Sequence, residues 1–112
     1  MTDISKNSQA VTFINIFTVA PETQQRVVDL LTEVTQRFVS GAKGFVSSSL
    51  HRGLDGTKVT MYAQWSSMED YLAMREDPRP LPYLKEVLTM ATFEPGAYEV
   101  VARFEPPTAT DR

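Results

Sequence analysis

Apolar positions that alternate in some segments and recur at helical spacing in others divide this chain into short strands and amphipathic helices. Val11–Val19 is rich in β-branched and aromatic residues, which is typical of a strand. Both faces of that strand are largely apolar, so we expect both to be covered. From Pro21 to Val39 apolar residues recur at helical spacing, and two glycines within Ser40–Gly44 suit a helix end and a turn. The chain therefore opens with a strand and a helix.

The middle of the chain predicts a hairpin and a second helix. Phe45–Arg52 and Lys58–Trp65 have strand composition, and Asp55-Gly56 between them is a strong hairpin signal. Ser66, with Glu69 three residues later, matches a capping box, so we expect the second helix to begin there. The residues that fall on one face of this helix are Met68, Tyr71, Leu72 and Arg75.

The last third predicts a break, a further helical segment and one final strand. The prolines of Glu76–Pro82 cannot continue the second helix, because each removes a donor and clashes with the preceding turn. Tyr83–Ala91 resumes helical spacing, and Glu94-Pro95-Gly96 predicts a turn. Tyr98–Phe104 predicts the last strand.

The resulting order, β-α-β-β-α-β, is the split pattern of the ferredoxin-like α+β fold. We place it at residues 11–105 as a four-stranded antiparallel sheet with both helices on one side, between disordered tails at 1–10 and 106–112. The opposite sheet face would then expose a larger apolar patch than monomers usually tolerate. The expected members of that patch are Ile14, Ile16, Val46, Leu50 and Tyr62. A homodimer that packs sheet against sheet would cover them.

Composition excludes several kinds of site. The chain has no cysteine, so disulfides, iron–sulfur clusters, thiolate zinc sites and cysteine nucleophiles are ruled out. His51 is the single histidine, which makes a multi-histidine metal site within one subunit impossible, and we expect neither metal nor cofactor. We interpret His51 as an exposed or interface residue rather than a catalytic base. The net charge of −3, without a basic cluster, argues against nucleic-acid binding.

Targeting signals are not recognisable in this sequence. The first ten residues lack the basic start and apolar stretch of a signal peptide. No run approaches the ~20 apolar residues that cross a bilayer. We therefore expect a cytoplasmic protein without membrane association.

Three residues carry the candidate chemistry. Period-two geometry places Asn15 among phenylalanines, on the strand face that we assign to the helices. Trp65 leads into the second helix and Tyr71 lies on its first turns, so an amide, an indole and a phenol would meet in an apolar pocket. The further residues expected to bind a substrate are Phe17, Phe38, Met61, Met68 and Arg75. The alternative interpretation of the three candidates is packing, with the Asn15 amide satisfied by backbone groups.

Three segments in order resemble the antibiotic biosynthesis monooxygenase family. They are FINIFTVAPE (Phe13–Glu22), GFVSSSLHRGLDGTKVTMYAQWSS (Gly44–Ser67) and MATFEPGAYEVV (Met90–Val101), and the similarity covers most of Val11–Phe104. The resemblance implies a dimeric α/β barrel. In the best-known members it also implies oxygenation of polycyclic aromatic phenols or anthrones to quinones by molecular oxygen, without metal or flavin.

The same resemblance implies roles for the three candidates. Trp65 would donate its indole N–H to a substrate or peroxide oxygen, Tyr71 would orient a carbonyl or phenolate, and Asn15 would assist. Such a protein needs only to bind its substrate in a dry site, stabilise the oxyanion and place the oxygen. Many members have Asn where this chain has Met61, whose thioether cannot donate a hydrogen bond. Asn15 is then the substitute donor.

The sequence thus predicts a homodimeric, cofactor-independent monooxygenase acting on an anthrone, naphthol or quinol-like molecule. One alternative is a non-oxygenase of the same fold, such as a cyclase, an isomerase or a ligand-binding dimer in which Met61 marks the lost donor. Another is a structural dimerisation module, which predicts that no small molecule binds. A haem-degrading relative would need an axial histidine on the second helix, and Ser66–Ala91 contains none.

Overall fold

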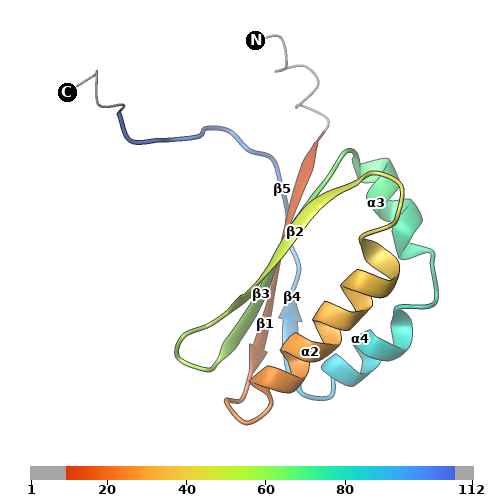
Figure 1. The fold of residues 1–112 in the computed structure, drawn as a ribbon, viewed down its shortest axis with the longest axis vertical. Coiled ribbons are helices and arrows are strands. Elements are labelled where there is room, and N and C mark those ends of the chain that lie inside the picture. The colour runs from red at the N-terminus through yellow and green to blue at the C-terminus, as the bar shows by residue number, and fades with distance from the viewer. Residues whose placement is uncertain (1–9, 108–112) are drawn as a thin grey trace.

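The structure, a computed structural model, describes residues 10–107 and follows the predicted order of strands and helices (Figure 1). The strands are β1 (Val11–Val19), β2 (Phe45–Arg52), β3 (Lys58–Trp65), β4 (Ala91–Glu94) and β5 (Ala97–Tyr98). The helices are α2 (Gln24–Val34), the π-helical turn η1 (Thr35–Val39), α3 (Met68–Arg75) and α4 (Leu81–Val87).

The sheet has the strand order β2-β3-β1-β4, with β5 also paired to β1, and the described pairings are antiparallel. This is the order of the ferredoxin-like fold, which confirms the predicted fold class. The helices cover one side of the sheet (Figure 1). Buried residues of β1, β3, α2 and α4 form the larger core cluster, and a smaller cluster surrounds Trp65 at one end of the sheet.

The first helix consists of the regular α-helix α2 and the π-helical turn η1 that continues it. It begins at Gln24 and passes into η1, whose end is marked by the Ser40 N–H donating to the Thr35 carbonyl at 2.9 Å. The buried Gln24 side chain donates from Nε2 to the Gly53 and Lys58 carbonyls, each at 3.0 Å, which fixes the helix to the β2–β3 hairpin. The predicted helical segment is confirmed as far as Val39, with its last turn widened, but it begins at Gln24 rather than at Pro21, because residues 21–23 form a turn.

The two strands of the hairpin have the predicted bounds, but β2 contains a bulge. Its register with β3 shifts between Phe45 and Ser47, after which Ser48 lies opposite Ala63 and Leu50 opposite Met61. The prediction that Leu50 lies on the bare sheet face is therefore wrong, because Leu50 packs against the core. An inserted residue moves every later side chain to the other face.

Helix α3 begins one residue later than predicted. The Ser67 Oγ accepts the Asp70 backbone N–H at 3.1 Å, so Ser67 is the cap, while the Ser66 hydroxyl donates to the Asp70 carboxylate at 3.0 Å. The α3 residues that were predicted to share one face differ in their exposure to solvent. Met68 and Leu72 are 40% and 53% exposed, whereas Tyr71 packs against the smaller core cluster.

The end of the fold differs from prediction. Helix α4 begins at Leu81, with Pro82 in the first turn where a missing N–H is tolerated, and it ends at Val87. The prediction that the helix continues to Ala91 is wrong, because Ala91 begins β4, which pairs with β1. The predicted last strand is present only at Tyr98, because β4 and β5 already occupy the free edge of β1. Pro95 interrupts their ladder because it cannot donate, and the Ile14 N–H donates to the Gly96 carbonyl at 3.0 Å.

The chain after β5 leaves the body of the molecule. Residues 99–107 are exposed and lie outside any strand, and Figure 1 shows them extending away from the sheet. The predicted tails at 1–10 and 106–112 fall largely outside the described residues. Within residues 10–107, no helix has the length and apolar character to cross a membrane.

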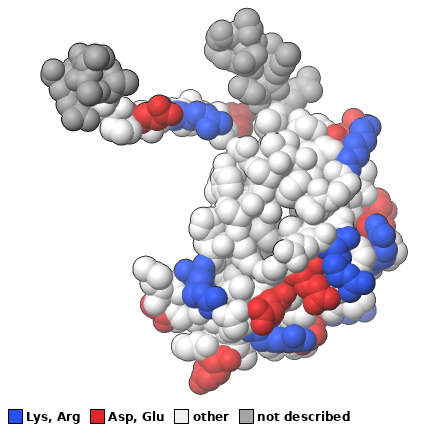
Figure 2. Space-filling model, in the orientation of Figure 1, with Lys and Arg blue, Asp and Glu red and all other residues white. Residues whose placement is uncertain are grey.

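The side of the sheet opposite the helices carries few charges. Ile14 lies opposite Tyr62 and Ile16 opposite Thr60, and all four side chains are half-buried rather than enclosed. The helices lie on the other side of the sheet (Figure 1), so no helix within residues 10–107 covers this face. Figure 2 shows Lys, Arg, Asp and Glu gathered mainly over the helices and at the tip of the β2–β3 hairpin.

Candidate active site

A cavity of about 280 Å³ lies between the sheet and the helices. Its walls are mostly apolar and come from β1, β2, β3, α2, η1, α3, α4 and β4. The polar side chains that line it are those of Asn15, Thr35, Ser48, Tyr71 and Arg75. A mostly apolar hollow with a few polar groups is the usual composition of a small-molecule site.

The Asn15 amide is the polar group of β1 in this cavity. It follows Phe13 and precedes Phe17 on the same strand face, and it lies opposite Met61 on β3. The Asn15 Oδ1 atom is buried, and it has no hydrogen-bond partner within residues 10–107. An unsatisfied buried acceptor costs roughly 1 to 3 kcal/mol. A ligand hydroxyl or N–H would satisfy it.

Tyr71 reaches the cavity from α3 and is held on both sides of its ring. Phe13 stacks on the ring at 3.8 Å between centroids, and Trp65 meets it edge-on at 5.8 Å. The Tyr71 hydroxyl accepts a hydrogen bond from Arg75 Nη1 at 3.2 Å. Because the hydroxyl oxygen is the acceptor in that bond, its own hydrogen stays available as a donor.

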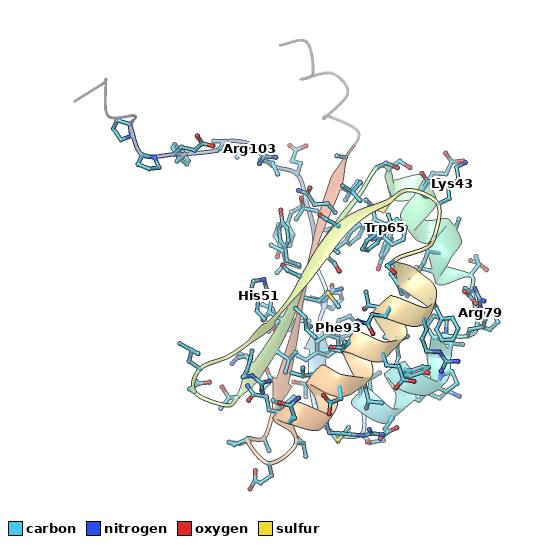
Figure 3. The ribbon with its side chains drawn as sticks, viewed as in Figure 1. Lys43, His51, Trp65, Arg79, Phe93 and Arg103 are labelled. Atoms are coloured by element: carbon cyan, nitrogen blue, oxygen red, sulfur yellow. The ribbon has the colours of Figure 1, made fainter. Side chains whose placement is uncertain are left out.

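Trp65 lies behind this wall. It is 1% exposed, and its indole packs edge-on against Phe45 at 5.5 Å and against Tyr71, outside the set of residues that line the cavity. Figure 3 shows Trp65 at the end of β3 on the helix side of the sheet. The structure thus brings Asn15 and Tyr71 to one cavity and places Trp65 in contact with Tyr71.

Some of the residues predicted to bind a substrate line the cavity and others do not. Phe17, Met61 and Arg75 line the cavity, whereas Phe38 and Met68 do not. Phe38 meets Tyr83 edge-on and lies under the Arg37 and Arg79 guanidinium groups, at 5.1 and 4.9 Å. A π-helical turn changes which residues share a face, so Val39 lines the cavity where regular helical spacing predicts Phe38.

Several lining residues were not predicted from the sequence, and Thr35, Ser48 and Phe93 show why. Thr35 lies at the start of η1, and Ser48 faces the cavity only because of the β2 bulge. Phe93 belongs to β4 and stacks on Phe17 with centroids 4.7 Å apart, pointing from the sheet toward α2 in Figure 3. The alternation of Ala91, Phe93 and their neighbours was the available signal for that strand.

The linker between α3 and α4 is held by an ion pair beside the cavity. Arg79 donates from Nε and Nη2 to both carboxylate oxygens of Asp77, at 2.7 to 3.0 Å. These side-chain hydrogen bonds, with the Arg79 backbone N–H, lower the pKa of Asp77 below its ordinary value. The buried Pro80 that follows lines the cavity, so the linker contributes to its wall.

His51 is remote from this site. It is exposed and lies on the opposite side of the sheet from Trp65 and Phe93 (Figure 3), with its Nε2 2.9 Å from the Ser49 hydroxyl. The interpretation of His51 as an exposed residue is confirmed. Over the described range 10–107, histidine, aspartate and glutamate form no group of three or more that could hold a metal ion.

Comparison with known proteins decides the family. The model of the antibiotic biosynthesis monooxygenase family matches residues 10–79. The chain belongs to this family. It is also 38% identical over 104 residues to the tetracenomycin-F1 monooxygenase of Streptomyces glaucescens, covering 93% of each chain.

Solved structures agree with this family assignment. The cofactor-independent oxygenase SnoaB of Streptomyces nogalater is 27% identical, with a TM-score of 0.67 over 89% of this chain and 99% of SnoaB. The ActVA-Orf6 monooxygenase of Streptomyces coelicolor, solved with nanaomycin D, has a TM-score of 0.78 over 95% of this chain and all of its own. Because that protein is 24% identical, its likeness shows the fold alone.

Proposed function

We propose that this protein is a cofactor-independent monooxygenase that oxidises an aromatic small molecule of the anthrone, naphthol or quinol type with molecular oxygen. The observation that carries the proposal is the unpartnered Asn15 amide oxygen inside an apolar cavity that Tyr71 also lines. The names of two relatives, tetracenomycin-F1 monooxygenase and the cofactor-independent oxygenase SnoaB, support the same reaction class.

In this reaction the protein needs only to bind the substrate and to stabilise the negative charge that develops on it. An anthrone that loses a proton becomes an electron-rich anion, which passes an electron to oxygen and then forms a carbon–oxygen bond. Cleavage of the resulting peroxide turns the CH₂ group and O₂ into a carbonyl group and water. Apolar walls that exclude water, together with donors placed at the oxyanion, lower the barrier to the first step.

The cavity supplies groups for these tasks. In our proposal the Asn15 Oδ1 accepts a hydrogen bond from a substrate hydroxyl, which removes the unsatisfied acceptor. The Tyr71 hydroxyl donates to the oxygen that becomes negative, and Arg75 beside it favours that charge. The family resemblance implies that the Trp65 indole N–H is a further donor. Because Trp65 lies outside the residues that line the cavity, we assign it instead the role of holding the Tyr71 ring in place.

We also propose that the protein works as a homodimer. The uncovered sheet face with Ile14, Ile16 and Tyr62 supports this, because exposed apolar patches of this kind commonly mark an interface. Two copies that pack these faces together would remove them from water without changing the cavity, which opens on the other side of the sheet. The proposed active dimer therefore contains two separate sites.

Oxygen uptake with a model anthrone tests the proposed activity. Protein treated with a chelator and freed of coloured contaminants is mixed with anthrone in an oxygen-electrode cell. We expect saturable consumption of one O₂ per anthrone, well above the rate in buffer, with anthraquinone as the product. A rate equal to the buffer rate at every protein concentration contradicts the proposal.

A second candidate function is favoured by one residue. Met61 lies directly opposite Asn15 and lines the cavity with a thioether that cannot donate a hydrogen bond. A non-oxygenase of the same fold, such as a cyclase, an isomerase or a ligand-binding dimer, would tolerate this. Saturable quenching of the single tryptophan by an anthraquinone, without any oxygen uptake, would favour that candidate.

A further inference from the structure

Charge is distributed unevenly over the cavity. Among the side chains that line it, Arg75 alone is ionised at neutral pH. Arg75 is hydrogen-bonded to the Tyr71 hydroxyl, and within residues 10–107 no carboxylate lies within ion-pair distance of it. Other basic residues near the helices, such as Arg26 and Arg79, do have carboxylate partners at 2.8 and 2.7 Å. The cavity thus has one positive group without a counter-ion.

Arg75 is also positioned to contact a ligand. It lines the cavity and is exposed, which places its guanidinium at the rim rather than in the interior. Only Nη1 donates to Tyr71, so the N–H groups on Nε and Nη2 remain for a second acceptor. A planar guanidinium binds a carboxylate through two parallel hydrogen bonds, which an ammonium group cannot imitate.

The polar groups of the cavity would pair with two different kinds of ligand group. Asn15 Oδ1 is an acceptor that lacks a donor, whereas Arg75 and Tyr71 are donors that lack an anion. Phe13, which stacks on Tyr71, is two residues before Asn15 on the same strand face, a distance of about 6.6 Å along a strand. A fused aromatic ring system spans a separation of this order.

From this arrangement we infer that Arg75 is a specificity-determining residue, which selects aromatic substrates carrying a carboxylate at one end and a hydroxyl group at the other. The inference rests on the proposed function and names a substrate class for it. The rings occupy the apolar interior, and the carboxylate stays at the rim, where water still reaches it. That position avoids the large penalty of burying an anion completely.

Two anthraquinones of nearly equal shape test this inference without turnover. Quenching of the single tryptophan, Trp65, measures the Kd of anthraquinone-2-carboxylate and of its neutral 2-carboxamide. We expect the wild-type chain to prefer the carboxylate by about 10-fold, since a charge-assisted hydrogen bond at a partly exposed site is worth roughly that much. Arg75→Gln should reduce the preference to less than about 2-fold, and Arg75→Lys should retain part of it.

Arg52→Gln is the matched control. It removes the same charge from an exposed arginine at the end of β2, and this residue does not line the cavity. The carboxylate preference should survive that change. Equal affinity of both ligands for the wild-type chain, a preference that persists in Arg75→Gln, an equal loss in Arg52→Gln, or no binding of either ligand overturns the inference.

Failure of the proposed function gives a different pattern. If the carboxylate preference depends on Arg75 but anthrone consumes no oxygen, the monooxygenase proposal is wrong and anion recognition at this rim stands. If oxygen uptake is normal but the two ligands bind equally, the activity stands and Arg75 does not select the substrate.

Discussion

The Asn15 side chain lowers the stability of the fold but binds the substrate in the proposed function. Its Oδ1 is buried without a partner, so the folded protein carries an acceptor that water satisfies in the unfolded chain. Replacement by an apolar side chain of similar size removes that penalty. We therefore expect Asn15→Leu to leave the free energy of unfolding unchanged or to raise it by about 1 kcal/mol, measured by denaturant unfolding. A clear loss of stability would show that the amide has a structural partner.

Thr12 on the same strand provides the contrast for that measurement. Thr12 is 6% exposed, and its hydroxyl accepts a hydrogen bond from Gln64 Nε2 at 3.4 Å, whereas the Asn15 Oδ1 has no partner within residues 10–107. Thr12→Val leaves that side-chain amide with one partner fewer, so we expect a loss of about 0.5 to 1.5 kcal/mol. Opposite signs for the two substitutions would separate an acceptor kept for a ligand from one that stabilises the fold.

Tyr71 and Trp65 have different positions and should respond differently to substitution. Tyr71→Phe removes a hydroxyl that lines the cavity, and we expect at least a ~10-fold fall in kcat, which is typical for loss of one positioned donor. Trp65→Phe keeps an edge contact with Tyr71 and should lower kcat less. Steady-state oxygen-uptake kinetics measure both. A larger effect of Trp65→Phe would mean that its indole N–H acts on the substrate directly.

The residues of the cavity could be predicted only where the backbone pattern is regular. Asn15, Phe17 and Met61 lie on strands without irregularities, and period-two alternation placed them correctly. Phe38 lies within a π-helical turn and Ser48 follows a bulge, and both irregularities change which residues share a face. Neither irregularity has a distinctive residue pattern in this sequence.

At the scale of elements, Gly44 lies in the loop between η1 and β2, and it packs against the start of α3. Its φ of +86° favours glycine, and an added Cβ would lie 2.4 Å from the Asp70 Cβ. The Gly44 carbonyl also accepts the Ser66 N–H at 2.7 Å, next to the cap of α3. This glycine thus allows the loop to contact the helix that carries Tyr71.

We expect Gly44→Ala to lower the free energy of unfolding by about 1 to 3 kcal/mol, from backbone strain and the overlap with Asp70. Gly41 in the same loop is the control, because an added Cβ there meets nothing within 4 Å. Gly41→Ala should be neutral or slightly stabilising. Denaturant unfolding of both variants measures the difference, and equal losses would contradict the role assigned to Gly44.

The elements themselves were predictable where the signals were strong. The bounds of β1, β2 and β3 follow directly from β-branched runs and the Asp55-Gly56 hairpin signal. The last strand was placed too late, because local composition cannot show that β1 has a free edge to which Ala91–Tyr98 pairs. That information is tertiary and is absent from any short window of sequence.

At the scale of the whole molecule, the uncovered sheet face predicts self-association. One chain has a mass of 12.6 kDa. We expect sedimentation equilibrium of the full chain to give twice that mass. Ile14→Glu places a charge on that face and should yield folded monomers, whereas Leu81→Glu, on the exposed surface of α4, should leave the dimer intact. A wild-type monomer at micromolar concentration would contradict the proposed dimer.

The central claim is that the lone amide in this cavity holds a substrate for oxygenation. The initial rate of oxygen uptake with saturating 1,8-dihydroxyanthrone, whose hydroxyl groups can donate to Asn15 Oδ1, tests it most directly when the wild-type chain is compared with Asn15→Leu. We predict a fall of at least ~10-fold in a variant that remains fully folded, because a group that positions the reacting molecule is lost. An undiminished rate in folded Asn15→Leu would contradict the claim.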